Sequence, residues 1–208
     1  MAGQIVAILG GGGFVGKAIG RALLDCRADV FCLNRRGESG DPDIAGVRVD
    51  RRNPLQVLDV LDRLQADITI DCIGLIESDT LPLVDALNAR GGRFVFVSSV
   101  DVYAAFGRVL GTEPGRVDTM PLSETSPLRS VLRPYSSIEG RAEYDKIPLE
   151  DHVLGATRLD SRIARLPAMF GPNDPRRRFK DVVSAALAGS SLEMPMDLAR
   201  WRFDMLFI

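Results

Sequence analysis

Glycines near the start of the chain have the types and spacing of a ligand-binding turn. Gly10, Gly13 and Gly16 satisfy G-x-x-G-x-x-G, and a G-x-G-x-x-G pattern overlaps it, between an apolar run and a helical pattern. Glycine there allows a tight turn and lets the backbone approach a pyrophosphate, which the free N–H groups of the helix N-terminus can bind. We therefore predict dinucleotide binding through these three glycines, Phe14 and Val15. The alternative is a structural turn without a ligand.

The end of the second apolar run indicates which dinucleotide is bound. Sites for NAD usually place Asp or Glu about 20 residues past the turn, to hold the ribose 2′-hydroxyl. This chain has Asn34, Arg35 and Arg36 there instead. Because arginine can clamp a 2′-phosphate through two hydrogen bonds, we predict NADP(H), with NAD as second choice. Alternatively, both arginines are solvated loop residues. Asp50, after the third run, could bind the adenine amino group or be a turn residue.

Strands and helices must alternate to position these residues. Apolar runs typical of buried strands and helical patterns follow one another along the chain. The expected strands are 5–9, 30–33, 47–49, 68–73, 94–97 and 163–166, and the expected helices are 14–24, 54–64, 81–89, 135–146 and 176–187. The helix over 135–146 is expected to stop at Pro148, and 104–133 is expected to be a long loop. This order predicts an α/β fold with a doubly wound parallel sheet and helices on both faces. We also assign Cys72 and Gly74, after the fourth strand, to the cofactor site.

Composition excludes several other functions. The net charge of −2 gives no surface suited to nucleic acid, and no window is apolar enough to span a membrane. The three cysteines form no CxxC pair, which favours reduced thiols and a cytoplasmic location. His152 is the only histidine, so a histidine-based triad or metal site has no second member, and we expect no metal.

Four segments together resemble the short-chain dehydrogenase/reductase superfamily, in its extended and atypical branch of NAD(P)-dependent epimerases, dehydratases and reductases. They are ILGGGGFVGKAIGRALL, FVFVSSVDVY, SETSPLRSVLRPYSSIEGRAE and RLPAMFGPNDPRR. The resemblance implies a Rossmann fold and hydride transfer at a carbonyl or sugar-nucleotide-like small molecule. It places Ser99 at the position that orients the substrate oxygen and Tyr135 at the catalytic tyrosine.

The chain departs from this resemblance at the lysine that lies four residues after the catalytic tyrosine and lowers its pKa. Glu139 stands there, and in a helix it would share a face with Tyr135 and raise the tyrosine pKa. Lys146 would lie about 16 Å further along the same helix. We therefore expect an enzyme with a non-standard active site that lacks the lysine. The alternative is a catalytically inactive redox sensor or scaffold.

The last residues suggest a second, incomplete part. We expect a cofactor-binding domain over 1–170 and the start of a substrate-binding part over 171–208, in a fragment that lacks most of that part. The run Arg176–Arg178 could meet a substrate phosphate or be a solvated helix start. Trp201 is expected in the core, and any assembly is expected to be a homodimer.

Overall fold

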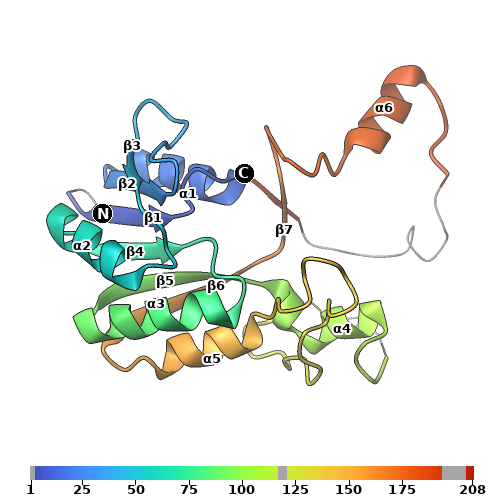
Figure 1. Cartoon of the computed structure of the whole chain (residues 1–208). Coiled ribbons are helices and arrows are strands. Elements are labelled where there is room, and N and C mark those ends of the chain that lie inside the picture. The colour runs from blue at the N-terminus through green and yellow to red at the C-terminus, as the bar shows by residue number, and fades with distance from the viewer. Residues whose placement is uncertain (1–2, 117–120, 194–204) are drawn as a thin grey trace. The chain divides into compact units, whose positions relative to one another are not determined.

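A computed structural model describes residues 3–116, 121–193 and 205–208 (Figure 1). The chain divides into two compact units, Met1–Leu166 and Pro167–Ile208. Among the described residues, no helix is long and apolar enough to cross a membrane.

The first unit is built on one parallel sheet of six strands. Its order is β3-β2-β1-β4-β5-β6, so the order reverses between β1 and β4. This is the Rossmann fold, which confirms the predicted doubly wound α/β class. The strands are β1 (Ile5–Leu9), β2 (Asp29–Asn34), β3 (Ala45–Arg48), β4 (Ile68–Asp71), β5 (Gly92–Ser99) and β6 (Leu159–Leu166). In open sheets of this kind, ligands bind beyond the carboxyl ends of the strands at the reversal point.

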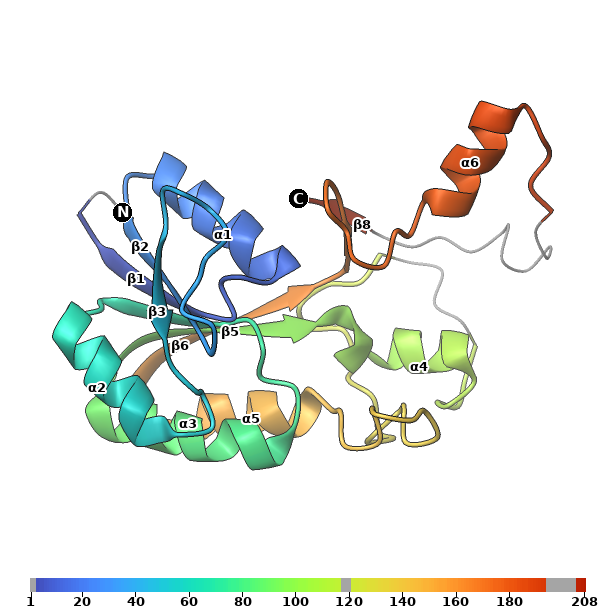
Figure 2. The ribbon, with the colours of Figure 1, turned by 45° about the horizontal axis from the view of Figure 1, so that its top comes forward.

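Helices cover both faces of the sheet, as the alternating pattern predicts. The helix α1 (Phe14–Asp25) lies on one face, and α2 (Pro54–Leu64), α3 (Glu77–Arg90) and α5 (Ile147–Gly155) lie on the other (Figure 2). Successive residues of β1 serve opposite faces, since Val6 and Ile8 join one buried cluster while Ala7 and Leu9 join the other. This burial on both sides explains why the strands read as continuous apolar runs.

Local chemistry sets the ends of α2, the helix whose predicted bounds are reproduced without change. The Asn53 side chain accepts a hydrogen bond from the Gln56 N–H, and Pro54 follows at the start of the helix. Proline fits there because its missing N–H would have no partner within the helix. The helix ends at Leu64, and the residue that caps it, Gln65, has a left-handed backbone with φ of 54°.

The predicted helix over 135–146 is wrong. Residues 134–146 form a series of turns and bends, and α5 begins only at Ile147. Pro148, expected to stop a helix, instead stands in the first turn of α5, where a proline is tolerated. Gly140, with φ of +73°, lies within the turns and takes a conformation that a helix cannot include. A helix that the sequence did not predict, α4 (Ala104–Leu110), begins the segment expected to be a loop.

The second unit holds a short parallel pair, β7 (Ala168–Phe170) and β8 (Met205–Phe207), and the helix α6 (Lys180–Ala188). The ring of Phe170 packs edge-on against Phe179 and Phe207. Arg178 is bound by the Asp174 carboxylate, so one arginine of the run Arg176–Arg178 has a structural partner. Trp201 lies outside the described residues.

Candidate functional site

The glycine turn follows β1 at the reversal point of the sheet. Gly10 has φ of +81°, and a Cβ on Gly16 would collide with the Gly10 carbonyl oxygen. A Cβ on Gly11 would lie 3.0 Å from the Cys32 sulfur. The turn therefore needs glycine for steric reasons at more than one position, as the sequence pattern predicts.

The N-terminus of α1 is suited to a negatively charged group. Its N-cap residue, Gly13, makes no side-chain hydrogen bond to the helix, and the first turn carries no acidic residue. Phe14, Val15 and Gly16 thus start a helix of 12 residues whose end has no side-chain cap. Free N–H groups and the positive end of the helix dipole fit a pyrophosphate in this turn.

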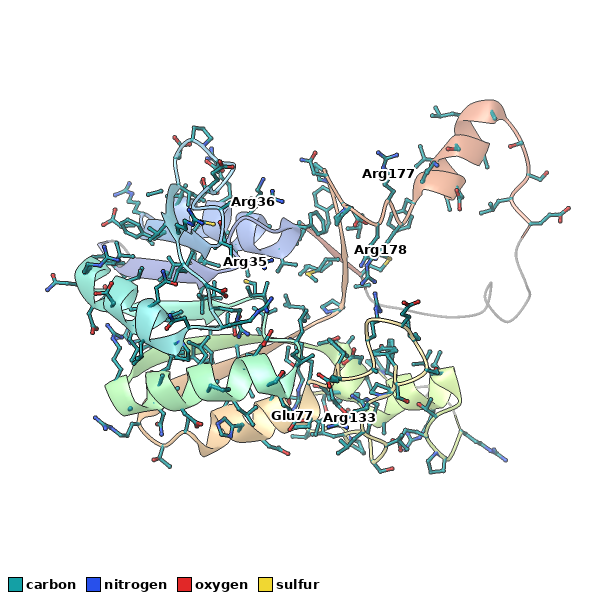
Figure 3. The ribbon with its side chains drawn as sticks, in the orientation of Figure 1. Arg35, Arg36, Glu77, Arg133, Arg177 and Arg178 are labelled. Carbon is teal, nitrogen blue, oxygen red and sulfur yellow. The ribbon has the colours of Figure 1, made fainter. Side chains whose placement is uncertain are left out.

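A cavity of about 260 Å³ lies beside this turn, where an adenosine moiety would be expected. Three predicted residues, Asn34, Arg35 and Asp50, line it, whereas Arg36 does not. Figure 3 labels Arg35 and Arg36. The full lining is Leu9, Leu33, Asn34, Arg35, Val49, Asp50, Arg51, Arg52, Ile73 and Asp79. Asn34 also shapes the loop that follows β2, because its side chain accepts hydrogen bonds from the backbone N–H groups of Arg36 and Gly37.

Sequence reasoning missed a buried ion pair in the cavity wall. The Arg51 guanidinium donates to Asp71 Oδ2 at 2.5 Å and to the Asp79 carbonyl oxygen at 3.0 Å. The Asp71 side chain is fully buried, and its other oxygen accepts the Ile73 N–H. The pair therefore ties the loop after β3 to the end of β4. An aspartate closing an apolar strand was the signal available in the sequence.

Ser99 closes β5 at the same edge of the sheet. Its Oγ accepts the Asp101 N–H at 3.2 Å and so caps a short 3-10 turn, η1 (Val100–Val102). The Asp101 side chain is buried, and burial raises the pKa of its carboxyl. Asp101 Oδ2 accepts hydrogen bonds from two phenol hydroxyls, that of Tyr144 at 3.0 Å and that of Tyr135 at 3.3 Å.

The two tyrosines lie against each other, with ring centroids 5.6 Å apart. Burial, followed by the Asp101 charge, raises the pKa of Tyr135 to about 12. The same causes raise the pKa of Tyr144, and a hydrogen bond with Ser99 opposes the rise. The predicted Tyr135 and the neighbouring Tyr144 both lie at the site, and Tyr144 makes the shorter of the two hydrogen bonds to Asp101.

Lys146 lies under the ends of β4 and β5. Its ammonium donates hydrogen bonds to the carbonyl oxygens of Gly74 and Val97, and it lies 4.7 Å from the centre of the Phe96 ring. Only 3% of the residue is exposed. Burial lowers the pKa of Lys146 to about 8, against the opposing charges of Asp71 and Asp101.

The argument that Glu139 occupies the place of a catalytic lysine is wrong, because it required a helix that is not there. Glu139 is exposed in the turn segment. Lys146 instead comes to the site just before α5, two residues after Tyr144. Sequence spacing could not reveal this, because turns and tertiary contacts set the distance between these groups.

The remaining predicted residues, Cys72 and Gly74, follow β4, and neither lines the cavity. The Cys72 thiol has its pKa raised to about 12 by burial, so it is protonated at neutral pH. A Cβ on Gly74 would lie 2.5 Å from the Phe96 ring, so this position needs glycine for close packing. Its carbonyl is one of the two acceptors of Lys146.

Comparison with known protein families identifies the family of the chain. The family model described as "NAD dependent epimerase/dehydratase family" matches residues 6–205. The chain belongs to this family. The resemblance drawn from the sequence is thereby confirmed. No curated protein sequence matches the chain.

Solved structures of similar fold come from the same group of enzymes. A dTDP-glucose 4,6-dehydratase from Bacillus anthracis, in complex with NAD, has a TM-score of 0.64 and 18% identity over 91% of this chain. A UDP-glucose 4-epimerase from Thermotoga maritima, with UDP-glucose, has a TM-score of 0.69 and 15% identity over 98% of this chain. The chain spans 63% of the dehydratase and 69% of the epimerase. At these identities the likeness establishes the fold.

Proposed function

We propose that this chain binds NADP(H) and forms the cofactor-binding part of an oxidoreductase or epimerase acting on a carbonyl or sugar-nucleotide-like small molecule. The observation that carries the proposal is the convergence of Ser99, Tyr144 and Lys146 at the carboxyl edge of the sheet, beside the glycine turn. Family membership supports the reaction type. The substrates named for the similar structures, glucose nucleotides, support a sugar-nucleotide class.

Each residue has a distinct task in this proposal. The bound dinucleotide supplies or accepts the hydride. The Ser99 hydroxyl orients the substrate oxygen, and the Tyr144 hydroxyl gives a proton to that oxygen or takes one from it. Because the pKa of Tyr144 is raised, its phenol carries the proton at neutral pH and suits the direction of carbonyl reduction. Tyr135 packs against Tyr144 and shares its acceptor, Asp101.

Lys146 takes the electrostatic task that the lysine performs in the superfamily. With a pKa of about 8 it is largely cationic at pH 7, and it faces the charges of both Asp71 and Asp101. The proposal therefore replaces the predicted lysine-free site with one in which the lysine reaches the cluster from a different place in the sequence. Deleting its charge is expected to raise the Tyr144 pKa further.

The preference for NADP(H) rests on the charge at the cavity. Arg35, Arg51 and Arg52 line it, and no acidic residue stands at the end of β2 to hold a 2′-hydroxyl. Arg51 is occupied by Asp71 and Asp79, and Arg52 pairs with the Asp79 carboxylate at 3.7 Å, which leaves the exposed Arg35 as the main candidate to bind a 2′-phosphate. The family is described as NAD dependent, so the proposed preference for NADP(H) rests on the residues of this chain and not on the family.

Titration of NADPH and NADH by fluorescence tests this preference. NADPH is expected to bind at least about 10-fold more tightly, since a charge-assisted hydrogen bond contributes about 1.5–3 kcal/mol. Arg35→Ala should remove most of this difference. Arg36→Ala, one residue further and away from the cavity, is the matched control and should leave it unchanged. Equal affinity for both cofactors in the natural chain would refute the assignment.

Turnover of NADPH with a panel of carbonyl compounds and nucleotide sugars tests the reaction. Tyr144→Phe is expected to lower kcat by about 100-fold or more, the contribution of a proton-transferring side chain. Tyr135→Phe is expected to have a smaller effect, because the Tyr135 hydroxyl makes the longer of the two hydrogen bonds to Asp101. Tight NADPH binding without turnover of any compound would favour the redox sensor or scaffold. A larger loss in Tyr135→Phe than in Tyr144→Phe would exchange the roles of the two tyrosines.

A further inference from the structure

We infer that the buried ion pair between Arg129 and Asp145 positions Tyr144 and Lys146, in place of the helix that the sequence leads one to expect. The inference deepens the proposed function, on which it rests, because it names what sets the geometry of that site. Both side chains are almost completely buried, with exposures of 0% and 1%, and Arg129 Nη2 lies 2.9 Å from Asp145 Oδ1.

The Arg129 guanidinium binds two distant pieces of the chain and the Val131 carbonyl of its own segment. Its Nε donates to the Asp101 carbonyl oxygen at 2.5 Å, its Nη1 to the Val131 carbonyl oxygen, and its Nη2 to Asp145. The Arg129 backbone N–H also donates to the Val102 carbonyl oxygen at 2.8 Å. The guanidinium thus fixes Asp101, whose carboxylate accepts hydrogen bonds from both phenols, relative to Asp145, which follows Tyr144 in the sequence.

Asp145 is equally occupied, and it stands between Tyr144 and Lys146 in the sequence. Its Oδ1 also accepts the Ile147 N–H, which is the first N–H of α5, and its Oδ2 accepts the Arg133 N–H at 2.6 Å. The N-cap residue of α5, Lys146, makes no side-chain capping bond. Asp145 therefore caps α5 while it holds the preceding turn, and this sets where Lys146 enters the site.

The ion pair is needed because residues 134–146 have no regular structure to keep the phenol and the ammonium in register. In a helix, backbone hydrogen bonds fix the spacing of side chains one turn apart. In this segment, the ordering entropy must be offset by tertiary contacts. The three bonds of Arg129 and the two further bonds of Asp145 supply such contacts, in addition to the bonds of Lys146 and the two phenols themselves.

The composition of the chain allows the test to be made without measuring activity. It contains three lysines, Lys17, Lys146 and Lys180, and three tyrosines, Tyr103, Tyr135 and Tyr144. Selective labelling of lysine Nζ with ¹⁵N and tyrosine Cζ with ¹³C therefore gives three NMR signals of each kind. Their pH titration reports the pKa of Lys146 and of Tyr144 in the cofactor-free protein.

Arg129→Lys keeps the positive charge, but its single nitrogen cannot reach the three acceptors that Nε, Nη1 and Nη2 of the guanidinium bind. We expect the Lys146 pKa to rise by at least about one unit towards the ordinary lysine value, and the Tyr144 pKa to fall, as the turn segment moves away from the sheet. Asp145→Asn should cause the same two shifts. Val57→Ala removes buried side-chain volume in α2, far from the pair, and should leave both values unchanged.

A folded Arg129→Lys protein with unaltered pKa values for Lys146 and Tyr144 would overturn the inference. So would failure of both Arg129→Lys and Asp145→Asn to fold under conditions where Val57→Ala folds, because the pair would then serve the whole fold. Failure of the proposed function gives a different result. In that case the natural chain shows no turnover, while the two pKa values still respond to Arg129→Lys.

Discussion

At the scale of single residues, Lys146 is the side chain whose position the sequence pattern misrepresents most. Read as part of a helix with Tyr135, it would be far from the site. In the structure it lies beneath the ends of β4 and β5, bound by two carbonyl oxygens and facing a phenylalanine ring. A buried ammonium of this kind is costly, because few neighbours replace the hydration that it loses.

This cost predicts how stability depends on pH. The Lys146 pKa is lowered to about 8 in the folded chain, while the unfolded chain keeps the ordinary value of 10.5. Between these values the unfolded chain binds more protons, so the contribution of Lys146 to the free energy of unfolding rises as the pH increases. Relative to Lys146→Met, the natural chain should therefore gain about 2 kcal/mol of stability between pH 8 and pH 10.

Urea unfolding of both proteins across this range measures the effect. The comparison with Lys146→Met cancels the titration of groups that the two proteins share, including the two phenols whose pKa values are raised. Parallel stability curves for the two proteins would show that the ammonium is not desolvated as the structure indicates.

At the scale of elements, different forces determine two sets of turns, the one between β1 and α1 and those before α5. The first is determined locally, because Gly10 needs a positive φ and Gly16 has no room for a Cβ. The second is determined by distant partners, since Asp145 and Arg129 hold it to the end of β5. A pattern of side chains can therefore reveal the first turn and mislead about the second.

The local requirement at Gly16 leads to a direct test. Gly16→Ala places a Cβ against the Gly10 carbonyl oxygen and the Gly11 Cα, so the turn must open. We expect the free energy of unfolding to fall by about 1–3 kcal/mol, as in other overpacked sites, and NADPH binding to weaken at least about 10-fold. Thermal unfolding and fluorescence titration measure the two effects.

Gly155→Ala is the control for this prediction. Gly155 is the last residue of α5, and a Cβ there would meet nothing within 4 Å. Because alanine favours helix, the change should be neutral or slightly stabilising, by up to about 1 kcal/mol. If Gly16→Ala were as harmless as Gly155→Ala, the turn would not be built for close approach to a ligand.

At the scale of the whole molecule, the parallel sheet brings together groups that are distant in the sequence. The strand order places the ends of β1, β4 and β5 side by side, and with them Gly10, Asp71 and Ser99. The cofactor turn, the Arg51 pair and the tyrosine–lysine cluster thus share one edge of the sheet. In the proposed function, this arrangement would bring the cofactor and the proton donor together at the substrate.

The sequence by itself determined the features that depend on local sterics and on periodic burial. Glycine spacing located the tight turn between β1 and α1, apolar runs located the six strands of the sheet, and Pro54 marked the start of α2. These features can be predicted from the sequence because each residue acts on its own backbone or on an adjacent turn. The family resemblance, and with it Ser99, followed from motifs of the same kind.

Only the tertiary structure decided how the chemistry is arranged around Ser99. It replaced the helix expected at Tyr135 with turns, brought Tyr144 and Lys146 to the site, and buried Arg51 and Arg129 as partners of aspartates. The physical reason is that these groups are ordered by ion pairs and hydrogen bonds between residues far apart in sequence, such as Arg51 with Asp71. Such contacts produce no periodic pattern or motif in the sequence, because they depend on where the sheet places the end of each strand.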